Sequence, residues 1–581
     1  MSKILRVDMT EKTVKVEDVP EKYKELGGRA LTTQIVVDEV PPTSEPLGPF
    51  NKIVIAPGVL AGTHAPSSGR ISVGGKSPLT GGIKESNAGT PTSQKLGRLQ
   101  IKAIIVEGQA EDGDYLLKVS KEGAELLPAD ELKGKLTRDI NKEIFSKYGE
   151  KVGIMTTGVA GDYKMAMAGI CFNDPEGRAS RYSGRGGLGA VLGSKGLKAM
   201  VVDESNAPGV EIMDSDLFKQ GQKKMVEALR EHDVTKPGGA LNSFGTAVLV
   251  NILNEAGGYP TKNFISGQFE DAGKTSGEVI AETVQKRGGG MMGHGCNQGC
   301  IIRCSNVYPN EDGSEFTSCV EYESVWALGA NCGIGNLDHI AKLVDLCNEI
   351  GVDTIEAGVT LGVAMDVGIA SFGDGEGAIK LMDEIRQGTP LGFILGSGAW
   401  FTGKAYGHTR IPVVKRQGMP AYEPRAVKGI GVTYITTPQG ADHTAGYTIA
   451  PEILSVGGKV DPLSPEGKID LSRAFQATTA FIDSSGYCLF IVFAVLDIPK
   501  GMEGMVETLN AVLGTNWAVD DIHKLGMEIL RLEWEFNQKA GFTSNDDRPP
   551  EFMRYEKLPP HNQVFDIPEE ELDRMWAEFR K

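Results

Sequence analysis

The sequence lacks any apolar run long enough to cross a lipid bilayer. A membrane-spanning helix needs roughly 20 consecutive apolar residues, and no stretch of the 581 residues approaches that length. The beginning of the chain also lacks the layout of a signal peptide, since residues 3–7 already alternate as a β-strand does. We therefore expect a cytoplasmic protein that does not act in a membrane.

Positive charge is also scarce. The chain has 60 Lys and Arg residues against 77 Asp and Glu residues, which gives a net charge of -17 at pH 7. A surface this acidic repels phosphate backbones and anionic lipid headgroups. Nucleic acids and membrane surfaces are therefore poor candidates for partners.

Cysteine is too sparse for a disulfide-stapled secreted domain, because the chain has only eight cysteines in 581 residues. Their distribution carries more information than their number. Three of them lie close together, at Cys296, Cys300 and Cys304, while the others are scattered. In a reducing compartment, such a group indicates metal binding rather than disulfide formation.

Apolar patterning divides the chain into a β-rich part followed by a helical part. The length of 581 residues favours roughly two to four domains. Up to residue 205, strand-sized runs lie between loops rich in Gly, Ser, Thr and Pro, at residues 4–9, 13–16, 52–55, 101–106 and 197–202. After a break at residues 206–209 the spacing becomes helical, as in residues 216–230. We predict that the last helix is capped by Asp566, has Pro568 in its first turn and runs through Trp576.

The cysteine trio is the sharpest chemical signal in the sequence. Thiolates separated by a few residues can surround one metal ion or cluster, but three are one short of the four that a cubane cluster or a structural zinc usually needs. We interpret the trio as part of a 4Fe–4S site that the distant Cys488 completes. The alternative is a helical stripe of buried thiols, which the glycines before Cys296 and Cys300 disfavour. We expect His294 to lie near the site without binding the metal.

Two segments of the helical part share one layout. In residues 343–353 and in residues 480–488, an apolar helical run ends at a glycine, which suits a left-handed helix stop. The first segment then delivers Asp353, which can cap the next helix together with Glu356, and the second delivers Cys488. Both could be ordinary joints between helices. Their common layout favours a pair of matching loops that clasp one ligand.

A glycine-rich segment at residues 184–189 satisfies the pattern G-x-G-x-x-G. We discount a dinucleotide-binding interpretation, because no hydrophobic strand directly precedes this segment and a single match is weak. Residues 178–195 and 67–70 are dense in Gly, Ser and Arg, and such loops offer backbone N–H groups and guanidinium groups to phosphate. Plain turns with solvated arginines would give the same composition.

Further motifs stand in one order along almost the whole chain. They are Gly69-Arg70, residues 76–81, Asn87, residues 184–198, residues 244–251, residues 321–329, the two loops described above and residues 420–425. With these motifs the chain resembles the tungsten-containing aldehyde:ferredoxin oxidoreductase family. The resemblance implies an α+β fold, with a β-rich N-terminal base domain (1–208) and two mainly α-helical domains (209–417 and 418–581).

The same resemblance implies a bis-pterin cofactor that carries tungsten or molybdenum. Pterin dithiolene sulfurs would hold the metal without a protein ligand, in agreement with the lack of a His/Asp/Glu metal triad in the sequence. Arg70 and Asn87 would lie at the pterin phosphates and their Mg²⁺, with Arg185 and Gly186 close by. The two loops would bind the pterins through Asn348, Gly351, Asp353, Asp483, Gly486 and Cys488. The ligands of the 4Fe–4S cluster would be Cys296, Cys300, Cys304 and Cys488.

Two residues fall on catalytic positions of the family, Glu323 and His443. Taken alone, the former could be a capping carboxylate and the latter a packed histidine. A buried glutamate with a raised pKa can take a proton from a water or from the hydrated substrate. A histidine can donate a hydrogen bond to an aldehyde oxygen on which negative charge develops.

The chain departs from the family pattern in three places. Three residues separate Cys296 from Cys300, where the archaeal aldehyde enzymes have two. Asn348 replaces the aspartate that usually opens the first loop, which alters one pterin contact. Lys342 stands where some members carry a glutamate for an iron at a dimer interface, so we expect no such iron. We expect Cys332 and Cys347 to be small buried apolar residues.

These observations together predict oxidation of a small aldehyde with water to a carboxylic acid. Electrons would leave through the cluster to ferredoxin or to a small iron–sulfur subunit, and we expect an oligomer or a hetero-oligomer. A dearomatising subunit of the benzoyl-CoA reductase type is one alternative. An electron-transfer protein that keeps the cluster but lacks the pterin is another. The sequence does not decide between tungsten and molybdenum.

Overall fold

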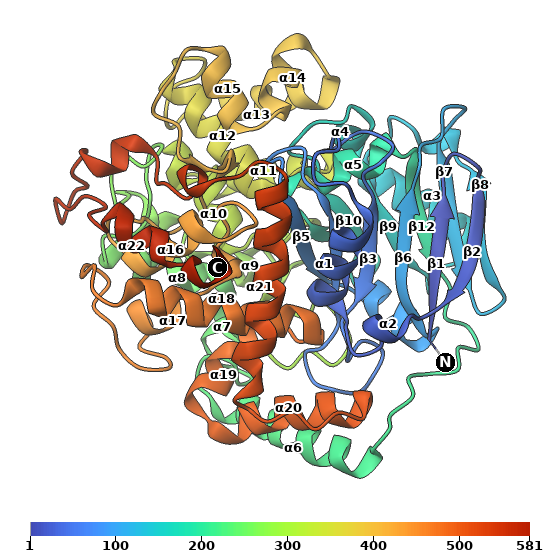
Figure 1. Ribbon diagram of the computed structural model, residues 1–581. Helices are drawn as coiled ribbons and strands as arrows, with labels where there is room; N and C mark the ends of the chain where they lie inside the picture. The colour runs from blue at the N-terminus through green and yellow to red at the C-terminus, as the bar shows by residue number, and fades with distance from the viewer. Residues whose placement is uncertain (1, 581) are drawn as a thin grey trace.

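The computed structural model describes residues 2–580 and places a β-rich part beside a helical part (Figure 1). One six-stranded sheet has the strand order β2-β1-β6-β3-β4-β5. Its strands are β1 (Lys3–Asp8), β2 (Thr13–Asp18), β3 (Ile53–Pro57), β4 (Arg70–Lys76), β5 (Ile83–Gly89) and β6 (Ile101–Glu107). The second six-stranded sheet has the order β11-β10-β9-β12-β7-β8. Its strands are β7 (Tyr115–Ser120), β8 (Gly123–Pro128), β9 (Gly153–Thr156), β10 (Ile170–Asn173), β11 (Ala179–Ser183) and β12 (Leu197–Val202).

The two sheets share one apolar core. Because side chains of a strand alternate between its faces, Leu5 and Val7 of β1 join Met155 and Met200 of the second sheet in this core. The helices α2 (Pro91–Arg98) and α5 (Leu188–Ser194) contribute to the same core. Ile4 of β1 belongs to a different cluster, on the face that α1 (Gly28–Glu39) covers.

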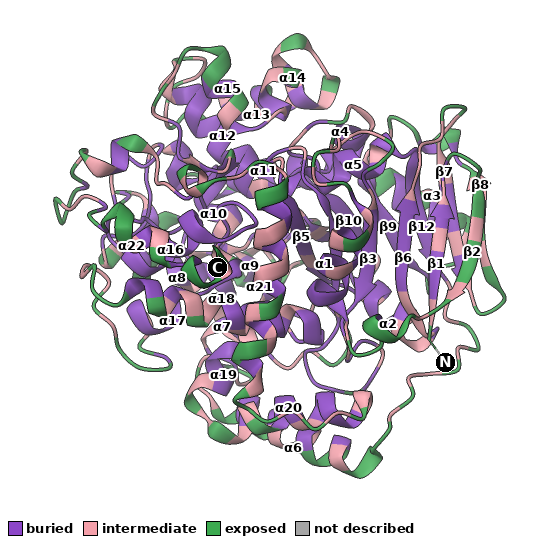
Figure 2. Cartoon of the chain, viewed as in Figure 1, coloured by how far each residue is buried: buried purple, intermediate pink, exposed green. Residues whose placement is uncertain are grey.

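Helices pack in pairs in the other part of the molecule. The pairs are α6 (Ser215–Glu231) with α20 (Pro499–Leu513), α18 (Lys468–Ser485) with α21 (Asp521–Lys539), and α10 (Tyr322–Leu328) with α12 (Thr354–Asp366). Their inner faces form one large apolar core, and exposed residues gather at outer elements such as α14 (Pro390–Gly396), as Figure 2 shows. No helix between residues 2 and 580 combines the length and apolarity of a membrane span.

The architecture confirms the predicted α+β class. The opening hairpin, the strands at β3, β6 and β12, and the helix over residues 216–230 all form where the sequence predicts them. The domain boundaries at residues 208 and 417 remain predictions. One sheet in the helical part was not predicted, and it contains β13 (Met291–His294), β14 (Ser305–Pro309) and β15 (Glu315–Ser318).

The prediction for the last helix was wrong in its cap. This helix, α22, spans Glu569–Arg574 and has Pro568 at the N-cap position. Asp566 instead pairs with the buried Lys428 over 2.7 Å, because an ammonium group in the core needs a partner for its charge. Trp576 lies beyond the helix and donates its indole N–H to the Thr436 carbonyl over 2.8 Å.

Both glycine-ended loops have the predicted left-handed helix stop. Gly351 follows α11 (Leu337–Ile350) with φ 84°, and Gly486 follows α18 with φ 92°. Asp353 caps α12, since its carboxylate accepts the Ile355 and Glu356 N–H groups over 3.0 and 3.2 Å. The predicted capping role of the Glu356 side chain was wrong. That carboxylate accepts N–H groups from two distant residues, Ala399 and Gly418, over 3.0 and 2.8 Å.

The β-rich part touches both loops through glycines. A Cβ atom on Gly58 would lie 2.1 Å from the Cα of Gly486, and one on Gly158 would lie 2.3 Å from the Ile350 carbonyl oxygen. Only glycine permits such a close approach of two backbones. The sheets therefore form a base against which both loops are seated.

Candidate active site

A cavity of about 350 Å³ lies where the β-rich part meets the helices. Its walls come from segments far apart in the sequence, including β5, β11, α10 and both glycine-ended loops. The predicted site residues that line it are Arg70, Asn87, Arg185, Cys296, Cys300, Cys304, Glu323, Asn348, Asp353, His443, Asp483 and Cys488. Three predicted positions do not line the cavity themselves. Gly186 directly follows Arg185, Gly351 directly precedes Val352 and Gly486 stands two residues before Cys488, and each of these neighbours is in the cavity wall.

Ser67 ties the two cysteine segments together. The trio lies in a loop, residues 295–304, which confirms that it is not a helical stripe. The Ser67 N–H donates to the Gly299 carbonyl over 3.1 Å, and the Ser67 hydroxyl accepts the Ile301 N–H over 3.2 Å. The Ser67 carbonyl accepts the Cys488 N–H over 2.9 Å. One buried serine thus holds the distant cysteine beside the trio.

The four cysteines offer sulfur ligands in a reduced state. None of the cysteines in the described chain forms a disulfide. A hydrogen bond from Cys300 lowers the pKa of Cys296 to about 5 against the effect of burial, and the charges of Arg181 and Arg70 lower it further. A thiolate at this position suits an iron–sulfur cluster, whose ligands are thiolates.

Arg70 and Asn87 are joined on neighbouring strands. The Arg70 Nε–H donates to the Asn87 side-chain oxygen, and Asn87 Nδ2 donates to Ser72 Oγ over 3.3 Å. Although burial lowers it, the pKa of Arg70 is raised by the thiolates of Cys488 and Cys296. The charge of this arginine therefore lies close to the cysteine site in the cavity wall.

The two glycine-ended loops present different side chains to the cavity. In the first loop, Asn348 donates its amide to the Ser318 carbonyl over 3.4 Å, and Asp353 lies at the other end of the loop as the cap of α12. In the second loop, Asp483 accepts from Arg29 over 3.3 Å. Burial raises the pKa of Asp483 to about 8, although the charges of Arg29 and Arg70 lower it.

Arg185 links the β-rich part to the first glycine-ended loop and to two further segments of the helical part. Its Nε donates to Asp353 over 3.1 Å, and its terminal nitrogens donate to the carbonyls of Ala441 and Gly418 over 2.6 and 2.7 Å. The neighbouring Gly186 has φ 83° and belongs to the G-x-G-x-x-G segment. A strand, β11, does precede this segment, and it escaped prediction because its sequence is polar. Within residues 2–580, β11 pairs only with the antiparallel β10, so the setting is not that of a dinucleotide fold.

Glu323 and His443 are neighbours in the cavity wall. Glu323 lies in the first turn of α10 and its Oε2 accepts the Ala421 N–H over 3.1 Å. Its Oε1 lies 3.4 Å from His443 Nε2. Burial raises the pKa of Glu323 to about 8 and lowers the pKa of His443 to about 4, so both groups are favoured in their neutral forms. The ring of Tyr422 lies 6.2 Å from that of His443.

Several buried polar atoms of the cavity wall have no hydrogen-bond partner among residues 2–580. They are Glu85 Oε1, Ser180 Oγ, Arg181 Nε, Glu323 Oε1 and His443 Nδ1. Buried polar groups are rarely left unpaired, because each such group costs about 1–3 kcal/mol. Unpaired donors and acceptors beside four cysteines fit a polar cofactor together with an iron–sulfur cluster.

Some residues of this wall were not predicted. Arg29 and Glu85 come from the β-rich part, and Cys319 follows β15. Nothing in the sequence near these residues signals a site, because their role depends on packing between distant segments. Arg181 lies in the Gly/Ser/Arg-rich segment at residues 178–195, which was the one available signal.

Family models match both parts of the chain. Residues 4–204 match the model for the N-terminal domain of aldehyde ferredoxin oxidoreductase, and residues 220–581 match the model for its domains 2 and 3.

Curated relatives cover almost the whole chain. The tungsten-containing aldehyde ferredoxin oxidoreductase of Pyrococcus furiosus is 37% identical over 577 residues, which are 96% of this chain and 92% of the relative. The corresponding protein of Thermococcus kodakarensis is 36% identical over 581 residues, with the same coverage. A more distant relative is the WOR-like subunit of an aliphatic sulfonate oxidoreductase from Pyrococcus furiosus, at 27% identity over 96% of this chain and 90% of the relative.

A solved structure shares the fold. The BamBC active-site complex of benzoyl-coenzyme A reductase, bound to 1,5-dienoyl-CoA, contains a chain that superposes with a TM-score of 0.78. The alignment covers 100% of this chain and 93% of that chain, at 17% sequence identity. At this identity the likeness shows the fold alone.

Proposed function

The chain belongs to the aldehyde ferredoxin oxidoreductase family of oxidoreductases, and from this we propose that it oxidises aldehydes to carboxylic acids. The reaction is R–CHO + H2O → R–COOH + 2 H⁺ + 2 e⁻. The electrons leave to a ferredoxin or to a small iron–sulfur subunit. The observation that carries the proposal is the buried pair Glu323 and His443, with an unpaired oxygen and an unpaired nitrogen in the cavity that also contains the four cysteines.

The proposed cofactors are a tungsten or molybdenum bis-pterin with Mg²⁺ at its phosphates and one 4Fe–4S cluster. Arg70 and Asn87 would hold the phosphate end, and Arg185 and Gly186 would position the adjacent backbone. The loop residues Asn348, Gly351, Asp353, Asp483, Gly486 and Cys488 would hold the pterins. Cys296, Cys300, Cys304 and Cys488 would hold the cluster. When bound, the metal centre would supply two-electron chemistry and the cluster would supply one-electron transfer to the acceptor.

Glu323 and His443 handle the protons. The pKa of Glu323 is about 8, which leaves part of its population ionised near neutral pH. This carboxylate can therefore take a proton from the attacking water. His443 is neutral at this pH because its pKa is about 4, and one of its nitrogens can donate a hydrogen bond to the aldehyde oxygen. Burial strengthens that bond, since little water competes for the oxygen.

The test combines metal analysis with an assay on protein purified without oxygen. We expect about four irons per chain, the content of one cubane cluster, with tungsten or molybdenum and aldehyde-dependent reduction of a viologen dye. Iron without either heavy metal, in protein from cells supplied with both, would support a cluster-only electron-transfer protein. Heavy metal with no aldehyde activity, but with reduction of an aromatic thioester, would support the benzoyl-CoA reductase alternative.

A further inference from the structure

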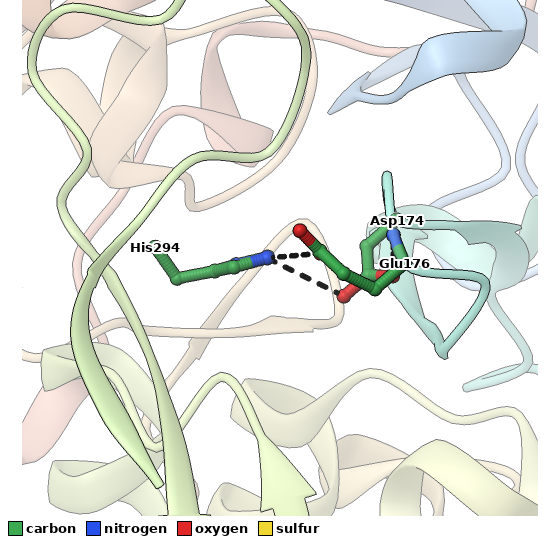
Figure 3. A group of neighbouring side chains, drawn as sticks. All are labelled: Asp174, Glu176 and His294. Carbon is green, nitrogen blue, oxygen red and sulfur yellow. Dashed lines mark hydrogen bonds and ion pairs between the residues drawn. The ribbon is translucent and has the colours of Figure 1, made fainter.

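One group of side chains beside the cysteine loop has the composition of a metal site. Asp174, Glu176 and His294 bring their ligand atoms within 4.8 Å of one another. Asp174 and Glu176 lie in the turn after β10, and Figure 3 shows the His294 ring pointing at their carboxylates. His294 Nε2 lies 2.6 Å from Glu176 Oε2 and 3.7 Å from Asp174 Oδ2.

Hydrogen bonding argues against a metal ion at this place. His294 Nδ1 lies 2.8 Å from Arg181 Nη2, and a guanidinium group can only donate. Nδ1 must therefore accept, and Nε2 of the neutral ring carries the proton that Glu176 accepts. A metal ion would need Nε2 without its proton. Arg178 also already donates to both carboxylates, over 3.0 and 3.1 Å. Asp174, Glu176 and His294 are therefore a hydrogen-bonded group that holds the side chain of Arg181 through His294.

Arg181 is held firmly at the cysteine site. Its Nη2 also donates to Ser305 Oγ over 3.0 Å, and Ser305 directly follows Cys304. Its Nη1 lies 3.6 Å from Glu321. The side chain is 9% exposed, so the charge sits in a region of low dielectric constant.

Unlike Nη2 of Arg181, its Nε–H group has no hydrogen-bond partner among the described residues. Nε is buried, and Nη2 has two partners. Arg181 lines the cavity together with Cys296 and Cys304. An unpaired charged donor at this depth indicates a ligand atom in front of it.

We propose that Arg181 is a second cationic donor to the iron–sulfur site, in addition to Arg70, and that its Nε–H donates to a cluster or cysteinyl sulfur. This inference rests on the proposed 4Fe–4S cluster. Reduction adds one electron to the site, which comes from the aldehyde, and that electron later leaves to the acceptor protein. A positive charge and an N–H donor at sulfur stabilise the added negative charge. Arg181 therefore raises the reduction potential of the cluster, and His294 and Glu176 keep it in place.

The experiment measures the cluster potential in the oxygen-free holoprotein by redox titration followed with electron paramagnetic resonance. We expect Arg181→Met to retain the iron of the parent protein and to shift the potential to more negative values. A tenfold change in the one-electron equilibrium corresponds to about 59 mV, and we expect at least this shift. Arg181→Lys keeps the charge but loses the fixed Nε–H, so a smaller negative shift is expected.

Arg178→Met is the matched control. It also removes one guanidinium charge from this group of side chains, but Arg178 pairs with Asp174 and Glu176, donates outward to Glu315 over 2.6 Å and does not line the cavity. Its potential should equal that of the parent protein. If Arg181→Met fails to load iron, the potential of Arg181→Lys decides. Parent-like potentials in every iron-loaded Arg181 variant overturn the inference. A parent protein without about four irons, the content of a cubane cluster, overturns the proposed cluster itself.

Discussion

Single residues acquire their proposed chemistry from burial. The side chains of Glu323 and His443 are each 17% exposed, and burial is the main cause of both pKa shifts. The nearby carboxylates of Asp442 and Asp353 raise the pKa of Glu323 further, while Arg185 opposes them. Neither residue type is unusual in a sequence. Their neutral forms at pH 7 follow only from the place where the fold puts them.

The pH dependence of turnover follows from this pair. Because the pKa of Glu323 is raised to about 8, its carboxyl group is mostly protonated below that pH and cannot accept a proton. We expect kcat/KM for an aldehyde to rise as the pH increases and to level off above pH 8. His443 stays neutral over this range, because its pKa is about 4. Steady-state assays on both sides of pH 8 test this, and a flat profile would contradict it.

Replacement of Glu323 by Gln should remove the base and leave the cavity intact. General base catalysis contributes about 10²–10⁴-fold, so we expect kcat to fall by that factor with unchanged iron and tungsten or molybdenum content. Glu321→Gln is the control, since Glu321 lines the same cavity but accepts from Ser305 over 2.5 Å. Full activity of Glu323→Gln would disprove the assigned role. Loss of metal would make the residue structural.

At the scale of helices and strands, the site depends on close contact between the sheets and the two glycine-ended loops. Helix α18 can end against the base only because Gly58 and Gly486 both lack a side chain. Cys488 follows this contact by two residues. The position of a helix end therefore sets the position of both a proposed pterin loop and a proposed cluster ligand.

Gly58→Ala tests this contact. The new Cβ would lie 2.1 Å from Gly486 Cα, so the loop must move. We expect a loss of about 1–3 kcal/mol of stability, as for overpacking in general, and fewer metal atoms per chain in elemental analysis. Gly273→Ala is the matched control, because nothing lies within 4 Å of its Cβ. Normal metal content and stability in Gly58→Ala would show that the loop tolerates the shift.

For the whole molecule, a buried ion pair joins residues 504 positions apart. Arg29 of α1 donates to both carboxylate oxygens of Glu533 of α21, over 2.9 and 2.8 Å. The side chains of Arg29 and Glu533 are 2% and 0% exposed. Arg29 also reaches Asp483, which lines the cavity. The pair thus fixes the β-rich base to α21, which packs against α18, the helix that ends at the second loop.

Glu533→Gln should destabilise the whole fold. Removing one partner of a buried pair leaves an uncompensated charge, which costs about 3–5 kcal/mol. We expect a large drop in the thermal unfolding midpoint, measured by circular dichroism. The control is Asp573→Asn, since Asp573 and its partner Arg548 are 36% and 20% exposed. Surface pairs contribute about 0–1 kcal/mol, so equal midpoints for the two variants would contradict the argument.

Local patterns in the sequence sufficed for the fold class and for much of the site. The hairpin β1–β2, the left-handed stops at Gly351 and Gly486 and the loop form of the cysteine trio follow from neighbouring residues alone. The two glycine stops are encoded by backbone freedom that other residues rarely have. The cysteine pattern and the resemblance to a family together located twelve residues that line the cavity.

Tertiary structure decided what depends on distant neighbours. The Arg29–Glu533 pair, the use of Asp566 as partner of Lys428 and the orientation of Arg181 all join segments with no sequence signal of their own. The strand β11 and the sheet β13–β15 were missed because polar residues can form strands when partners pair with them. Burial cannot be read from a residue and its neighbours, and burial determines the pKa values of Glu323 and His443. The sequence by itself determined which titratable side chains and cysteines the protein has. The packing of sheets against helices determined which of these side chains are charged and which carry a proton.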